Sequence, residues 1–491
     1  MRKLNVFIVF LFCPIISFAQ TEVKGDCSDN IRVKNLMKTV TTLASAEMQG
    51  RLSGGPGYKK AAKMMAIEFS ELGLKSYGKD FFQEFKTEYN EITNPGKLVL
   101  NKADGVVKAY QLGVDYVYRV FTGSGKVSSN VVFCGYGISE PDQGYDDYQD
   151  MEVKGKIVMV YKQNPSWKLG EKSFTDAPRD KAYTAKKHGA AALILVSKPE
   201  DEHPQKPIGS AMEGKASHVE DVPVLHVEIP VAEELLNMTP GQLLRLQQNI
   251  DKLKKPLHAV SETICDIEVQ AKYIPDASTY NVAALLEGSD PILKKEYVIV
   301  SAHLDHVGKQ GTFFFPGAND NASGSAGVLE IARALSACNY QPKRSILFVL
   351  FSSEEHGLDG SKYFAANLPD SAQKIVAILN MDCIAFGDSI HIGNGESSPL
   401  LWKDAKTLDA INTNYTVSRT WKGGGADLSP FHEKGIPGLY FASTNSYGNL
   451  HLPSDLPETL NKPLYEMIVK LVCKLTVNIA DGQYKREVII K

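Results

Sequence analysis

The segment Val298-Ile-Val-Ser-Ala-His303 is an apolar run that ends on a histidine, and the glycine-bounded loop Gly317-Ala-Asn-Asp-Asn-Ala-Ser-Gly324 follows it. A helical pattern from Ser325 to Leu335 comes directly after this loop. Strand, loop and helix in this order are typical of a parallel sheet, whose strands are buried on both faces and are therefore continuously apolar. This stretch predicts an α/β fold with polar side chains at the end of a strand.

The same pattern repeats along the C-terminal half of the chain. Apolar runs of strand length are found at Asn281 to Leu286, Tyr297 to Ala302, Ser345 to Phe351, Ile375 to Asn380 and Gly438 to Ala442. A second long helical stretch covers Pro463 to Val477. We therefore expect a mostly parallel mixed sheet sandwiched by helices, with ligand chemistry beyond the carboxyl ends of its strands.

The first residues have the composition of a secretory signal peptide. Met1-Arg-Lys-Leu is followed by the apolar run Val6 to Phe18 and then by Ala19. A basic start, a short apolar run and a small-residue stop predict that residues 1–19 are removed on export. Since no later apolar run reaches the length of a membrane span, we expect a soluble mature protein in the periplasm or outside the cell.

Composition narrows the classes of partner. The formal net charge of -3 gives no electrostatic reason to expect nucleic acid or an anionic membrane. Six scattered cysteines follow the signal peptide without a CxxC pair: Cys27, Cys134, Cys265, Cys338, Cys383 and Cys473. One or two disulfides in an oxidising compartment and buried free thiols are both open interpretations.

With 491 residues the chain is too long for one compact core. Residues 20–96 are predicted to be the N-terminal helical part of the main domain, because apolar residues recur there at helical spacing: Ala62, Met65, Phe69 and Leu72. Residues 97–272 change to short β-type runs and are predicted to form an inserted domain. Residues 273–491 carry the strand and helix repeats and should hold the functional site.

Arg51 lies in the loop Glu47-Met-Gln-Gly-Arg51, which the glycine-rich turn Gly54-Gly-Pro-Gly57 follows. A loop of this composition either exposes a charged side chain to solvent or uses it to anchor the chain. The sequence leaves both interpretations of Arg51 open.

Ionisable side chains follow successive strands of the predicted sheet. They are His303, Asp320 in the glycine-bounded loop, the pair Glu354-Glu355, Asp382 and His451. Taken singly, Asp320 could be a helix cap and His451 a loop residue. Together they converge on one sheet edge, where crowded carboxylates would repel one another unless cations neutralised them.

Two histidines and three carboxylates are a donor set that suits zinc, with cobalt or manganese as possible substitutes. One carboxylate bridging two ions would leave an open position for water, whose pKa falls to about 7 on metal contact. Of Glu354 and Glu355, one is expected to bind metal and the other to act as general base. Asp305 and Asp455 are expected to orient His303 and His451.

The chain resembles the M28 family of zinc aminopeptidases, in the branch with an inserted protease-associated (PA) domain. The resemblance rests on Ala302-His-Leu-Asp305, the Gly317 to Gly324 loop, Ser353-Glu-Glu-His-Gly-Leu-Asp-Gly-Ser361, Asn380-Met-Asp382 and His451-Leu-Pro-Ser-Asp455. A PA-type segment is similar at Val153-Lys-Gly-Lys-Ile-Val158, Lys181-Ala-Tyr-Thr-Ala185 and Gly189-Ala-Ala-Ala-Leu-Ile194. The resemblance implies a zinc exopeptidase fold of the phosphorylase/hydrolase-like kind, with an α+β insert that acts as a lid or as a filter of substrate length.

The resemblance also implies a role for each residue of the site. Asp320 matches the carboxylate that bridges two zinc ions. His303 and Asp382 would hold one ion, Glu355 and His451 the other. Glu354 would be the general base. Asn321, which with Ser323 forms a nominal glycosylation sequon, should then be buried and unmodified.

Two positions depart from the family pattern. Several relatives have a tyrosine directly before the final metal histidine, where this chain has Leu450; Tyr447 is the candidate for the oxyanion contact. Many relatives carry Ser-Asp-His ahead of Pro-Phe, where this chain has Ala426-Asp-Leu428, so Asp427 is a candidate substrate contact without the histidine.

The resemblance implies an aminopeptidase that acts on peptides with a free N-terminus. A glutamate-type carboxypeptidase or dipeptidase shares the fold and the metal set and is the alternative. Glutaminyl cyclase, another relative, is disfavoured because all the ligands for two ions are present. A non-catalytic peptide-binding protein is the alternative from another class. Because neither the base nor any ligand is missing, an active enzyme is the prediction.

Overall fold

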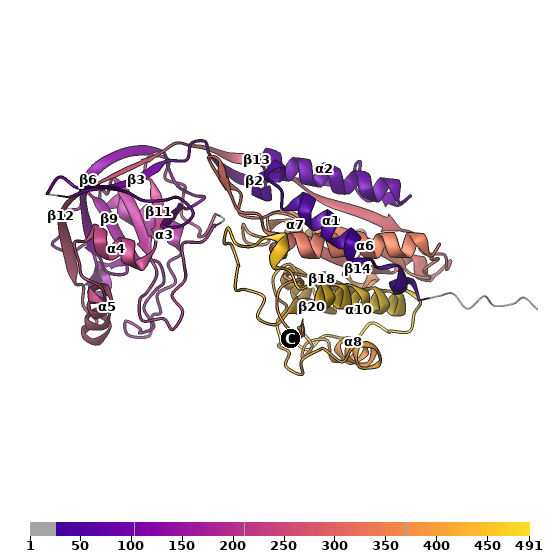
Figure 1. The fold of residues 1–491 in the computed structure, drawn as a ribbon. Coiled ribbons are helices and arrows are strands. Elements are labelled where there is room, and N and C mark those ends of the chain that lie inside the picture. Colours follow the sequence, from indigo (N-terminus) through magenta and orange to yellow (C-terminus); the bar gives the residue numbers. More distant parts are fainter. Residues whose placement is uncertain (1–25, 103, 211, 369–370) are drawn as a thin grey trace, which may run out of the picture.

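The computed structural model describes residues 26–102, 104–210, 212–368 and 371–491. Two lobes are visible in Figure 1, one built on a ten-stranded sheet and the other on an eight-stranded sheet. They are joined where β2 (Phe82–Ile92) and β13 (Ala271–Leu286) enter the larger sheet. The predicted signal peptide, residues 1–19, lies outside the described residues.

The larger sheet has the strand order β16-β15-β2-β13-β17-β14-β18-β20-β19, and β1 pairs with β13. Strands β17, β14, β18 and β20 are parallel neighbours, while β13 and β19 flank them in antiparallel orientation. The further bounds are β1 (Lys75–Ser76), β14 (Tyr297–His303), β15 (Lys309–Gln310), β16 (Phe313–Phe314), β17 (Ser345–Phe351), β18 (Ile375–Met381), β19 (Ile390–Gly393) and β20 (Gly438–Ser443). The predicted mixed α/β sheet is confirmed, but it is parallel mainly in its centre, and antiparallel pairings extend it on both sides.

Helices cover both faces of this sheet, which explains why its central strands are apolar throughout. In β17, Ile346 and Phe348 face one core and Leu347 and Val349 face the other. The first core is covered by α1 (Val33–Leu43), α2 (Pro56–Glu71), α6 (Gly324–Ala337), α8 (Pro399–Asn412) and α10 (Lys462–Ala480). The second is covered by α7 (Asp359–Ala366) and α9 (Ser429–Glu433).

The N-terminal segment contributes a strand as well as helices. After α2 the chain forms β2, which pairs with β13 over most of its length. The sequence Phe82-Gln-Glu-Phe-Lys-Thr-Glu-Tyr-Asn-Glu-Ile92 has its apolar residues three or four positions apart, and it lacks the continuous apolar run of the central strands. Its pairing also extends β13 well before Asn281, where the predicted strand begins.

The smaller lobe has the strand order β4-β3-β12-β6-β9-β10-β11-β5. These strands are β3 (Lys97–Asn101), β4 (Val107–Ala109), β5 (Tyr116–Tyr118), β6 (Gly125–Cys134), β9 (Ile157–Tyr161), β10 (Ala192–Val196), β11 (Val224–Val227) and β12 (His258–Val269). Helix α3 (Pro178–Lys187) packs on one face, and α4 (Ile229–Leu235) and α5 (Gln242–Leu253) pack on the other. A short hairpin, β7 (Ser139–Glu140) and β8 (Tyr145–Asp146), lies beside it.

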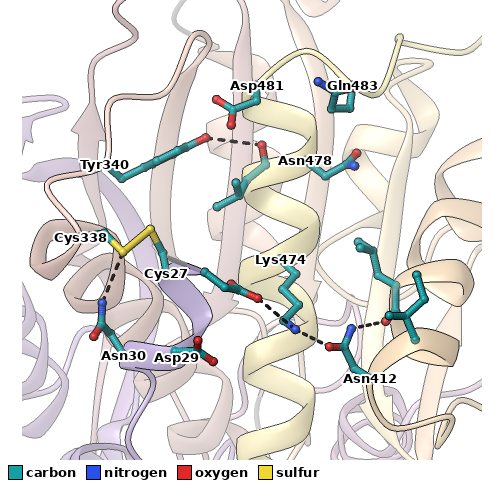
Figure 2. A pocket seen from close by; sticks show the side chains of 14 residues that line it. Cys27, Asp29, Asn30, Cys338, Tyr340, Asn412, Lys474, Asn478, Asp481 and Gln483 are labelled. Atoms are coloured by element: carbon teal, nitrogen blue, oxygen red, sulfur yellow. Dashed lines mark hydrogen bonds and ion pairs between the residues drawn. A yellow bond between two sulfur atoms is a disulfide. The ribbon is translucent and has the colours of Figure 1, made fainter. Parts of the chain in front are cut away.

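A disulfide joins Cys27, near the start of the described chain, to Cys338 after α6. It lines a surface groove of about 960 Å³ together with Lys474 of α10 (Figure 2). Lys474 forms an ion pair with Asp26 at 3.1 Å. The other four cysteines of the described chain are buried free thiols. Of the two open interpretations, a disulfide thus holds for Cys27 and Cys338, and buried free thiols hold for the other four cysteines.

No helix in the described ranges is both long and apolar enough to cross a membrane.

Candidate dinuclear metal site

The parallel strands bring three of the predicted site segments to one edge of the larger sheet. His303 is the last residue of β14, and β14 lies between β17 and β18. Glu354 and Glu355 follow β17, and Asp382 directly follows β18. Because the carboxyl ends of parallel strands meet at one edge, residues far apart in the sequence become neighbours.

Asp320 lies at the centre of the site. Its Oδ1 is 3.3 Å from His303 Nε2, and its Oδ2 is 3.1 Å from His451 Nε2. His303 Nε2 is also 3.3 Å from Asp382 Oδ1, and His451 Nε2 is 3.0 Å from Glu355 Oε2. The five predicted ligands therefore form two groups that share Asp320.

The donor atoms in each group are spaced as zinc requires. Zinc binds nitrogen and oxygen at about 2.0 to 2.1 Å, so two donors on one tetrahedral ion lie about 3.3 Å apart. The contacts from Asp320 to His303 and His451 are within a few tenths of an ångström of this value. The residues present therefore fit zinc at two adjoining positions.

Sequence reasoning missed His306. Its Nδ1 is 3.0 Å from Glu355 Oε1 and 3.7 Å from Asp320 Oδ2, and its side chain is fully buried. The ligand atoms of His306, Asp320, Glu355 and His451 all lie within 4.8 Å of one another. The spacing His303-Leu-Asp-His306 was the available signal, because the chain after β14 turns and brings a second imidazole back to the same edge.

The loop that carries Asp320 depends on a glycine. Gly317 has φ of +59°, and a Cβ at this position would lie 2.4 Å from the carbonyl oxygen of Asp320. Asn321 is fully buried, with its side-chain amide donating to Met381 O at 3.0 Å. The expected burial of the sequon asparagine is confirmed.

Two buried carboxylates hold the backbone around the ligands. Asp305 accepts hydrogen bonds from the backbone amides of Glu354 (3.2 Å) and Glu355 (3.3 Å). Asp455 accepts hydrogen bonds from the backbone amides of Asn319 (2.8 Å) and Asp320 (3.0 Å). His303 Nδ1 contacts the backbone carbonyl of Asp305 at 3.2 Å, which leaves Nε2 facing the site. These partners fix where the ligands point.

Arg51 is a structural anchor beneath the site. Its guanidinium is fully buried and donates to the carbonyl oxygens of Leu43 (2.7 Å), Leu304 (2.9 Å), Pro316 (2.8 Å) and Gly317 (2.8 Å). It thus ties the N-terminal segment to the loops after β14 and before Asp320. The surface interpretation of Arg51 is excluded by its burial.

Burial and neighbouring charges set the protonation of the carboxyl groups. Burial raises the pKa of Glu354 well above its usual value, and the nearby charges of Asp427, Glu355 and Asp382 add to this shift. Burial also acts on Asp320, but hydrogen bonds with His303 and His451 outweigh it and hold the Asp320 pKa well below its usual value. Two carboxyl groups in one site therefore differ in their affinity for protons.

A cavity of about 470 Å³ opens over the candidate ligands and is also lined by Glu354, Leu450 and Tyr447. Tyr447 is 57% exposed as a residue, although burial of its hydroxyl raises the Tyr447 pKa to about 12. Asp427 is fully buried and does not line this cavity, and burial raises its pKa to about 7. A second cavity of about 880 Å³ adjoins the first, and both are lined by Trp421, Tyr440 and Tyr447.

The helix-covered sheet thus carries two adjoining groups of zinc-type donors beyond its parallel strands. Residues 281–476 match the model of peptidase family M28, and residues 122–235 match that of the PA domain. The chain therefore carries a peptidase family M28 domain at residues 281–476, with a PA domain inserted between β2 and β13, as its sequence motifs predicted.

Individual relatives agree with this assignment. Leupeptin-inactivating enzyme 1 of Streptomyces exfoliatus is 34% identical over 197 residues, which cover 38% of this chain and 41% of that enzyme. Aminopeptidase YwaD of Bacillus subtilis is 23% identical over 94% of this chain and 88% of its own. The solved structure of a zinc aminopeptidase from Bacillus subtilis has the same fold, with a TM-score of 0.64 at 20% identity over 94% of this chain and 98% of that one.

Proposed function

We propose that this protein is an exported aminopeptidase that uses two zinc ions to hydrolyse the N-terminal residue from peptides. The observation that carries the proposal is the position of Asp320, whose two oxygens face two histidines of separate donor groups. His303 and Asp382 would complete one zinc site, and Glu355 and His451 the other. Relatives named as aminopeptidases support the reaction class.

Zinc bound at these positions supplies Lewis acidity and lowers the pKa of water to about 7. Glu354 lines the cavity beside the donor groups and is the general base: it takes a proton from water and returns it to the leaving amine. Asp305 holds the Glu354 and Glu355 amides together, so the base and the neighbouring ligand keep a fixed separation. Tyr447 is the candidate donor to the developing oxyanion.

The second cavity is the proposed place for a substrate side chain. It starts at Tyr440, whose hydroxyl donates to Asp382 Oδ2 at 2.9 Å, and it extends past Trp421. A residue whose carbonyl lies over the donor groups can therefore extend its side chain into an aromatic-lined space.

Export is part of the proposal. The residues before Ala19 have the pattern of a signal peptide, and the Cys27–Cys338 disulfide is of the kind that persists in oxidising compartments. We also propose the domain limits 20–96 and 273–491 for the catalytic domain and 97–272 for the insert, supported by the division of strands between the two sheets.

The test is a substrate panel combined with metal analysis of the purified mature protein. We expect two zinc ions per chain, cleavage of aminoacyl p-nitroanilides, and no cleavage of their N-acetylated forms. Release of glutamate from N-blocked dipeptides would instead identify a glutamate-type carboxypeptidase. Bound zinc without cleavage of either substrate class would identify a peptide-binding protein.

A further inference from the structure

The PA domain touches the turn that carries His451. The backbone N–H of Gly209, between β10 and β11, donates to the carbonyl oxygen of His451 at 2.8 Å. Gly209 lies in the smaller lobe and His451 in the larger one, so this hydrogen bond joins the two lobes at a candidate metal ligand.

The backbone of His451 is held differently from that of the other histidine ligand. His303 belongs to β14, which is paired with strands on both sides. Residues 444–456, in contrast, form turns and bends without a strand or helix, and the φ of His451 is +54°. A residue with a side chain rarely adopts this left-handed conformation without support from its surroundings. The hydrogen bond from Gly209 supports this conformation of His451 from outside its own segment.

The donating segment is itself fixed within the PA domain. Arg119, whose side chain is fully buried, donates from Nη1 to the carbonyl of Ile208 at 2.9 Å. On the other side of Gly209, the hydroxyl of Ser210 accepts a hydrogen bond from the Val120 amide at 3.0 Å. The two residues directly after β5 thus hold residues 208 and 210, on both sides of the N–H that reaches His451.

The segment is also seated tightly against the larger lobe. A Cβ on Gly209 would lie 2.4 Å from Cγ2 of Val307, so no larger residue fits without displacement. Val307 and Phe315 of the larger lobe pack with Val117 of β5. Beside them, Gln310 accepts from the Tyr118 amide (2.9 Å) and donates to its carbonyl (2.7 Å). The interface between the lobes is therefore built from packing and paired hydrogen bonds.

We propose that residues 208–210 of the PA domain are a positioning element for His451, and that the PA domain thereby sets the affinity of the zinc ion held by His451 and Glu355. Gly209 touches neither the ion nor the substrate; it acts through the backbone of His451. This inference rests on the proposed role of His451 as a zinc ligand. It gives the insert a function within the metal site, in addition to any shielding of the cavity.

The test is zinc titration of the metal-free protein by calorimetry, with wild type, Gly209→Ala and His451→Ala compared. In Gly209→Ala the new methyl group displaces the segment, and we expect one of the two binding events to weaken by about 10- to 100-fold, the usual effect of losing a contact that orients a ligand. The other event should match wild type and serves as an internal control. Adding Val307→Ala to Gly209→Ala removes the clash and should restore the weakened event.

His451→Ala separates the proposed metal site from the proposed positioning role of Gly209. If this variant still binds two ions as tightly as wild type, the proposed metal site is wrong. If it loses one ion while Gly209→Ala binds both normally, the metal site stands and the positioning role of Gly209 is overturned.

A measurement on the unaltered protein covers the case in which Gly209→Ala fails to fold. Because coupling between two sites is reciprocal, removal of zinc by a chelator should speed hydrogen exchange of the Gly209 amide. An exchange rate that is the same with and without zinc would also overturn the inference.

Discussion

The carboxylate of Asp455 accepts a hydrogen bond from the backbone amide of Asp320 at 3.0 Å. One buried acid thus fixes the main chain of the residue that is shared by both donor groups. Burial raises the pKa of Asp455 to about 7, although the amides of Asp320 and Asn319 favour its ionised form.

Replacement of Asp455 should weaken both zinc ions together. In Asp455→Ala the amides of Asn319 and Asp320 lose their acceptor, and the shared ligand loses its fixed position. We expect about 10- to 100-fold lower affinity at both sites, measured by chelator competition. An effect confined to one ion would show that Asp320 is not shared.

Replacement of Glu354 should separate catalysis from metal binding. Glu354→Gln keeps the shape of the side chain but removes the base, so the turnover number should fall by about 100- to 10,000-fold with two zinc ions retained. Glu355→Gln is the matched control, and it should lose one ion. Unchanged turnover in Glu354→Gln would refute the role given to this residue.

His306→Ala should affect the ion on the His451 side. The distance between His306 Nδ1 and Glu355 Oε1 is 3.0 Å. If His306 orients Glu355, its loss frees the Glu355 carboxylate to rotate. If His306 binds the zinc ion itself, its loss removes a fourth donor from that ion. We expect one weakened zinc ion by calorimetry and an unchanged second one. X-ray absorption spectra of the zinc-loaded wild type and variant then tell whether the number of coordinated imidazoles falls. If His306→Ala bound both zinc ions as tightly as wild type, His306 would have no role in the metal site.

Reduction of the Cys27–Cys338 disulfide should destabilise the protein. The bond closes a loop with a sequence separation of 311 residues, and loss of a native disulfide typically costs about 2 to 5 kcal/mol. The melting temperature should therefore fall when a reducing agent is added. The double variant Cys27→Ser/Cys338→Ser should melt at this lower temperature with or without reductant.

Acid should destabilise the PA domain through His226. This histidine is fully buried, and burial lowers its pKa well below the usual value, with Lys162 and Arg119 adding to the shift. Below about pH 6.5 the unfolded chain binds a proton that the folded state excludes, so stability falls as pH falls, by at most about 1.4 kcal/mol per pH unit for this group. In urea unfolding of metal-free protein, His226→Gln should show a shallower loss between pH 7 and pH 5. The same loss of stability with pH in wild type and His226→Gln would contradict this role of His226.

The central strands were predictable because each is buried on both faces. Tyr297 to Ala302 and Ser345 to Phe351 differ from the observed β14 and β17 by at most one residue. Strand β2 was missed because its apolar residues recur three or four positions apart, which is helical spacing, and its assignment as a strand depends on pairing with β13. For the same reason the sequence showed the core of the larger sheet but not its N-terminal extension.

The candidate site divides in a similar way. His303, Asp382 and His451 could be named from their positions after apolar runs, and Asp320 from its glycine-bounded loop. The choice of Glu355 over Glu354 as the ligand came from the family resemblance. The structure brings these five residues together. His306 could not be assigned, because only the turn after β14 directs its imidazole toward Glu355. Arg51 remained ambiguous until its four carbonyl partners, contributed by distant segments, were visible.

The sequence by itself determined the class of fold, the family and the chemical types of the ligands, because apolar periodicity and short motifs are local properties of the chain. Only the tertiary structure decided which oxygen of Asp320 faces which histidine, and that the PA domain reaches His451 through Gly209. Those relationships are backbone and side-chain contacts between segments far apart in sequence. Their geometry is set by the packing of the sheets and the lobes, which the residues of any single segment do not encode.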